Sequence, residues 1–141
     1  MPPIPKRLSQ KSREPALPAL RILVIEDNAI IAMLLETTLA DMGHEVCAIE
    51  ATEAGAVAAA ERLRPDLLVV DAGLREGNGI SAVERILRGG FVPHVFVSGH
   101  DLRPEMLNSR AVRLSKPYDA RDLYAAIQTA LAAPVAIVGL D

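Results

Sequence analysis

The sequence predicts an α/β fold in which helices cover both faces of an open, doubly wound parallel sheet. From Arg21 onward, short apolar runs alternate with helical stretches, which is typical of successive βα units. Half of the 141 residues are hydrophobic but only 3% are aromatic. The core must therefore be built from Leu, Ile, Val and Ala, as in sheets covered by helices. This length indicates one domain, with no room for a second.

Five apolar runs are expected to form the strands of this sheet. They span residues 21–26, 45–50, 66–71, 93–98 and 111–114. The third run is continuously apolar up to Asp71, which predicts a central strand buried on both faces. Gly43 and Pro65 follow the first two helical stretches and are expected to end them.

The helices are predicted from apolar residues that recur at helical spacing. The first should begin near Asn28, with Ile31, Leu34, Leu35, Leu39 and Met42 on one face, and the second near Thr52. The third carries Ile80, Val83 and Leu87, residues 101–109 allow at most a short helix, and the last begins at Ala120 and buries Leu123, Ile127 and Leu131. Each predicted helix follows one strand, as βα units require.

The two ends of the chain differ from its middle. Residues 1–20 hold five prolines and four basic residues against one acid, which predicts a flexible basic leader before the domain at 21–132. Residues 133–141 form a tail too apolar for an ordinary exposed end. We expect this tail to pack on the sheet or on a second copy, with a homodimer contact through the tail or the last helix.

Composition also excludes several classes of function. The chain shows no signal peptide, and its late apolar stretch is broken by Gln128, Thr129 and Pro134, so a cytoplasmic protein without a membrane partner is expected. Beyond the leader the chain is acidic and lacks a helix-turn-helix pattern, which argues against nucleic-acid binding. Cys47 is the single cysteine, so no internal disulfide can form.

Side chains with chemical uses stand at the ends of four predicted strands. They are Glu26-Asp27, Asp71, Ser98 and Lys116-Pro117. In an open parallel sheet these ends line one crevice. Three carboxylates there would repel one another unless a cation compensates, and a set of oxygen ligands alone favours Mg²⁺. The simpler alternative is that Glu26 and Asp27 only begin the next helix, where acids suit the positive end of the helix dipole.

The same crevice has the groups needed to hold a phosphoryl group. Lys116 can hold a phosphoryl oxygen as a point charge, and the Ser98 hydroxyl can donate to another. Asp71 is the candidate nucleophile, since a carboxylate can accept a phosphoryl group while Mg²⁺ offsets the charge. Either Lys-Pro or Ser alone is more often surface or turn chemistry. Their ordered combination with the acids indicates a phosphate site.

With these motifs the chain resembles the receiver domain of two-component response regulators. The resemblance covers Arg21 to Ala132 and rests on ILVIEDN, LLVVDAGL, VFVSG and LSKPY. It implies a flavodoxin-like (βα)5 fold with sheet order 2-1-3-4-5, and a signalling domain rather than an enzyme. It further implies that Asp71 accepts phosphate from a histidine kinase or histidine phosphotransferase, and that the Lys116–Pro117 bond is cis. The implied Mg²⁺ ligands are Glu26, Asp27, Asp71 and the Gly73 main-chain carbonyl, while Ser98 and Lys116 contact the phosphoryl group.

Several positions depart from the pattern of that family. Arg113 stands where an aromatic switch residue is common, and it is either a surface residue or a gate that pairs with an acid. VFVSGH is similar to the F-A-T-G-Y signature of a subgroup that often stands alone. Arg75 replaces a common proline, and the expected modulating positions are Gly99, His100, Pro117 and Tyr118.

Three functions are compatible with these residues. The leading one is a single-domain response regulator that passes its signal to an unknown downstream protein or drains phosphate from a kinase. A second is a docking module with the same fold that works without phosphorylation, although the intact acidic set argues against it. A third is an aspartyl phosphatase, but Gly73 stands where such enzymes have a second acid.

Overall fold

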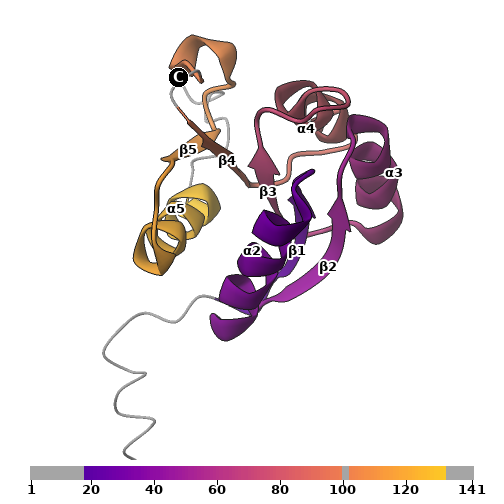
Figure 1. The fold of residues 1–141 in the computed structure, drawn as a ribbon. Helices are drawn as coiled ribbons and strands as arrows, with labels where there is room; N and C mark the ends of the chain where they lie inside the picture. The colour runs from indigo at the N-terminus through magenta and orange to yellow at the C-terminus, as the bar shows by residue number, and fades with distance from the viewer. Residues whose placement is uncertain (1–17, 100–101, 133–141) are drawn as a thin grey trace, which may run out of the picture.

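A computed structural model describes residues 18–99 and 102–132 as a five-stranded parallel sheet with the order β2-β1-β3-β4-β5 (Figure 1). The strands are β1 (Arg21–Ile25), β2 (Glu45–Glu50), β3 (Leu67–Asp71), β4 (His94–Ser98) and β5 (Val112–Ser115). The predicted fold class and strand order are therefore confirmed. The basic leader up to residue 17, His100 and the apolar tail lie outside the described residues, so the predictions made for them stay predictions.

Three helices and one 3-10 turn connect the strands, and a fourth helix follows β5. They are α2 (Ala29–Asp41), α3 (Glu53–Leu63), α4 (Gly79–Leu87), η1 (Pro104–Met106) and α5 (Ala120–Ala132). Asn28, Thr52 and Asn78 cap α2, α3 and α4, because each side chain accepts hydrogen bonds from main-chain N–H groups of the first turn. Only the turn η1 stands where at most a short helix was expected. None of the described helices has the length and apolarity needed to span a bilayer, and the cytoplasmic location stays a prediction.

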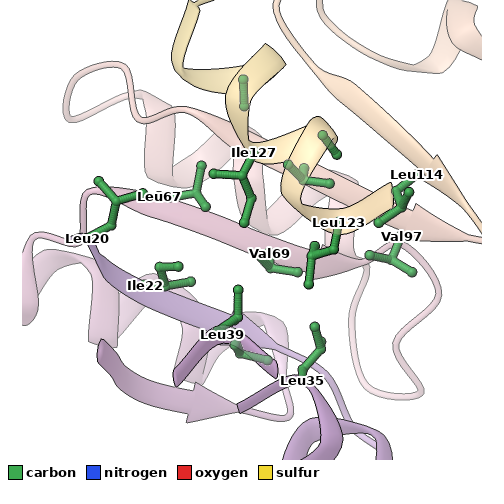
Figure 2. Close-up of a cluster of buried hydrophobic side chains, with 14 residues drawn as sticks. Leu20, Ile22, Leu35, Leu39, Leu67, Val69, Val97, Leu114, Leu123 and Ile127 are labelled. Carbon is green, nitrogen blue, oxygen red and sulfur yellow. The ribbon is translucent and has the colours of Figure 1, made fainter. Parts of the chain in front are cut away.

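Two apolar layers hold the sheet between its helices. On one face Ile22 and Val69 pack with Leu39 of α2 and with Leu123 and Ile127 of α5, as Figure 2 shows. The other face packs against α3 and α4 through buried residues of β1, β3 and β4 and the small residues of α3: Leu23, Ile25, Leu68, Val70, Phe96, Ala56 and Ala59. The central strand β3 is buried from Leu67 to Val70, as its apolar run predicts.

The buried face of α2 differs from the prediction. Leu34 was expected in the core but is 63% exposed, and Ile30 and Met33 are exposed beside it. The buried stripe instead runs through Ala32, Leu35 and Leu39. Almost every position in the first half of α2 is apolar, so the residue pattern alone did not identify the face that packs on the sheet.

Candidate functional site

Glu26, Asp27 and Asp71 lie together at the carboxyl edge of the sheet. Each offers a carboxylate oxygen, and these oxygens lie within 4.8 Å of one another. Strand pairing brings them together: β1 pairs with β3 so that Ile25 lies opposite Val70, and the three acids follow directly. Three hard oxygen donors in so small a space fit a divalent ion such as Mg²⁺, whose charge would relieve their mutual repulsion.

Glu26 is the buried member of the three, with 4% of its surface exposed. One carboxylate oxygen accepts the main-chain N–H of Asn28 at 3.0 Å. Burial raises the pKa of Glu26, and the neighbouring Asp71 adds to the rise, while Lys116 and the Asn28 hydrogen bond oppose it. A cation bound beside this carboxyl would favour its charged form and offset the cost of burial.

Asp71 is partly exposed and lies at the rim of a shallow pocket. Its Oδ1 accepts the main-chain N–H of Gly73 at 2.9 Å. The pocket has a volume of about 210 Å³, and Asp71, Gly73, Ser98 and Gly99 are among the residues that line it. A larger pocket of about 480 Å³ lies between the last turns of α3 and α4, and none of the three acids lines it. The small pocket therefore gives access to Asp71.

Ser98 and Lys116 reach the same edge of the sheet through β4 and β5. Val97 lies opposite Asp71 in the pairing of β3 with β4, so Ser98 follows one residue beyond. The main-chain N–H of Lys116 donates to the Ser98 carbonyl at 2.9 Å, and the Lys116–Pro117 bond is cis, as the resemblance implies. The four strand ends thus meet at one site.

A comparison with known protein families decides the identity of this arrangement. The sequence profile of the response regulator receiver domain matches residues 22–128. The chain belongs to this receiver family. Receiver domains are signalling modules that receive phosphoryl groups from histidine kinases, and an acidic set such as this one is typical of their phosphorylation site.

The sequence is also similar to those of individual regulatory proteins. The chain is 35% identical over 121 residues to the phyllosphere-induced regulator PhyR of Methylorubrum extorquens, covering 80% of this chain and 44% of that protein. It is 30% identical over 114 residues to the KDP operon transcriptional regulatory protein KdpE of Escherichia coli, covering 78% and 50%. The chain thus spans about half the length of these curated relatives.

Solved structures of receivers have the same fold. The receiver domain of Erythrobacter litoralis PhyR superposes with a TM-score of 0.73 at 28% identity and covers 87% of this chain and all of that one. SdrG from Sphingomonas melonis Fr1 gives a TM-score of 0.68 at 27% identity, covering 81% and 98%.

Arg113, at the usual switch position of receivers, contacts a main-chain carbonyl. Its exposed side chain donates through Nη1 to the Leu102 oxygen at 3.3 Å, and none of the ion pairs among the described residues involves Arg113. Arg113 therefore links β5 to the segment before η1, and its role as a switch stays a prediction.

Tyr118 is half-buried against the core layer of α2 and α5, and burial raises the pKa of its phenol.

Arg75 and Glu53 are two residues of the site region whose contacts the sequence does not reveal. Arg75 donates to the Asp27 carboxylate, and its main-chain N–H is the main cause that lowers the pKa of Asp27. Glu53, in the first turn of α3, accepts hydrogen bonds from the Asn78 N–H at 3.0 Å, the Ser81 hydroxyl at 2.7 Å and Arg85 Nη1 at 3.0 Å. Through these hydrogen bonds Glu53 connects α3 to the end of the loop that follows Asp71 and to α4.

We expect Glu53→Gln to lower the stability of the domain in a pH-dependent way. The hydrogen bonds hold the pKa of Glu53 below its usual 4.5, so the carboxylate stabilises the fold at neutral pH and loses this contribution as pH falls through the lowered value. Chemical denaturation of both proteins between pH 7 and the acid range measures the difference. The matched control is Glu105→Gln, which removes an exposed carboxylate 4.0 Å from Arg103. A stability gap that widened toward low pH would contradict this account of Glu53.

Proposed function

We propose that this receiver domain stores a phosphoryl group on Asp71, taken from the phosphohistidine of a histidine kinase or histidine phosphotransferase with the aid of Mg²⁺. A carboxylate oxygen of Asp71 forms the new O–P bond while the P–N bond breaks, and the leaving imidazole nitrogen takes up a proton. The product is an acyl phosphate. A bound Mg²⁺ would neutralise charge that gathers on the phosphoryl oxygens during this transfer.

The observation that carries this proposal is the difference in access among the three acids. Glu26 is buried and the Asp27 carboxylate is covered by Arg75, whereas Asp71 opens onto the pocket it shares with Ser98. Of the three acids, Asp71 is the one that lines this pocket, which gives a donor protein a route to its carboxylate. Glu26 and Asp27 are left with the role of metal ligands, to which the proposal adds the Gly73 carbonyl.

Ser98 and Lys116 are assigned to the phosphoryl group. Ser98 lines the pocket beside Asp71 and can donate its hydroxyl to a phosphoryl oxygen. Lys116 lies close enough to lower the pKa of Glu26 through its charge, so its ammonium group is within electrostatic reach of the acidic set and of an added phosphate. Gly73 supplies no side-chain acid to activate water, which favours storage of the phosphoryl group over rapid hydrolysis.

Incubation of the protein with a small phosphodonor such as acetyl phosphate, with and without Mg²⁺, tests the proposal by intact mass. We expect the mass of one added phosphoryl group with Mg²⁺ and little or none with a chelator, because the acidic set repels an anionic donor until a cation compensates it. A protein that stayed unmodified with Mg²⁺ would favour the alternative, a receiver that docks its partner without phosphorylation. The downstream partner, the homodimer and action as a single domain stay predictions.

A further inference from the structure

Arg75 covers one of the three carboxylates of the site. Its main-chain N–H donates to Asp27 Oδ2 at 2.6 Å, and its Nε lies 3.4 Å from the same oxygen. Its Nη2 also donates to the main-chain oxygen of Asp27 at 3.4 Å. The Arg75 side chain is 78% exposed and that of Asp27 only 13%. The exposed guanidinium thus lies against a carboxylate of which little is open to solvent.

The two kinds of contact have different consequences for a metal ion. The main-chain N–H is neutral, and it orients Asp27 while adding no full charge to the site. The guanidinium is a permanent cation, and its Nε lies 3.4 Å from one oxygen of a carboxylate that we propose as a metal ligand. Two cations at one carboxylate repel each other, so the side chain of Arg75 opposes metal binding while its main chain does not.

We propose that Arg75 is a built-in competitor of Mg²⁺, whose side chain holds Asp27 in the metal-free domain and is released when the metal binds. This inference rests on the proposed role of Asp27 as a metal ligand. It assigns a regulatory role to the loop of residues 72–78. In this loop Arg75 hydrogen-bonds to Asp27 in the segment after β1, and Asn78 hydrogen-bonds to Glu53 of α3. Metal occupancy is then coupled to the position of this loop beside Asp71.

Calorimetric titration with Mg²⁺ at low ionic strength tests the proposal on wild type and Arg75→Ala. The substitution keeps the main-chain N–H and removes an exposed side chain, so the fold should be unaffected. We expect the Kd of Arg75→Ala to be about two- to fivefold lower than that of wild type, the range expected for a partly exposed ion pair. The gap should shrink at high salt, where the guanidinium is screened.

Arg62→Ala is the matched control, because it removes one exposed arginine from the last turn of α3, away from the acidic set. Its Kd should stay close to that of wild type. A Kd for Arg75→Ala equal to or higher than the wild-type value would overturn the proposal. The same would follow if Arg62→Ala lowered the Kd for Mg²⁺ as much as Arg75→Ala does. In the wild type, the Arg75 Nε–H resonance should move as Mg²⁺ is added, and a resonance unmoved at saturation would also contradict it.

These titrations separate the two proposals. Saturable Mg²⁺ binding without any phosphorylation would overturn the proposed function and leave the competition by Arg75 standing. Phosphorylation with an unchanged Kd in Arg75→Ala would overturn the competition alone. A wild type that bound no Mg²⁺ would contradict both.

Discussion

Replacement of Phe96 by alanine is expected to lower the free energy of unfolding by about 3–5 kcal/mol. Phe96 lies in the middle of β4 with 1% of its surface exposed, in the core layer that faces α3 and α4. Its ring also meets the buried His94 ring edge-on, with centroids 5.6 Å apart. The truncation therefore removes a large buried surface and leaves a cavity. Chemical denaturation followed by far-ultraviolet circular dichroism measures the loss.

Phe91→Ala is the matched control for this prediction. Phe91 also contacts the His94 ring, at 5.7 Å, but it is 37% exposed. We expect its truncation to cost less than half as much as that of Phe96. If Phe96→Ala fails to fold, Phe96→Leu should fold with a loss of about 1 kcal/mol. Equal losses at positions 91 and 96 would contradict the core described here.

Asp71→Asn is expected to abolish Mg²⁺-dependent phosphorylation by a small donor. The amide is nearly isosteric with the carboxylate, so the fold should persist, but it is uncharged and cannot form the acyl phosphate. Intact mass after incubation with acetyl phosphate measures the loss. Asp41→Asn, at the exposed end of α2, should be labelled like wild type.

Asp27→Asn distinguishes the loss of a nucleophile from the loss of a metal ligand. Both variants remove one of three clustered carboxylates and should weaken Mg²⁺ binding. Labelling of Asp27→Asn should recover as Mg²⁺ is raised, whereas Asp71→Asn should stay unlabelled at any concentration. Recovery of Asp71→Asn would assign the acceptor role to another residue.

The sequence predicts those parts of the site that depend on strand ends. Glu26, Asp71 and Ser98 each follow an apolar run, and the parallel order of the strands is enough to bring them to one edge. The resemblance to receivers adds the order of the strands and the cis bond before Pro117, both of which the structure has. These features are fixed by local patterns and by topology.

Contacts between loops could not be predicted in the same way. Arg75 meets Asp27 across 48 residues of sequence, and neither residue lies in a periodic pattern that would pair them. In the sequence, Glu53 is an ordinary acid in the first turn of a helix. Its hydrogen bond from the loop after Asp71 is visible only in the structure. Leu34 was misplaced because α2 is apolar on several sides, and only packing decides which side is buried.

The hydrogen-bond partners of His94, a core residue, could not be predicted from the sequence either. It is fully buried, with Nδ1 2.8 Å from the Val92 carbonyl and Nε2 3.1 Å from Asn108 Nδ2. These partners fit a neutral ring that donates through Nδ1–H and accepts at Nε2, and burial lowers its pKa accordingly. A histidine within an apolar run does not reveal such partners, because one of them lies in the segment after η1.

The most direct test of the proposed function is to locate the phosphoryl group. Protein labelled in the presence of Mg²⁺ is treated with borohydride, which reduces an acyl phosphate to an alcohol, and is then digested for peptide mass spectrometry. Asp71 should be converted to homoserine, and only in samples that received the phosphodonor and Mg²⁺. A phosphate ester on Ser98, or homoserine at a position other than 71, would contradict the assignment of Asp71 as the acceptor.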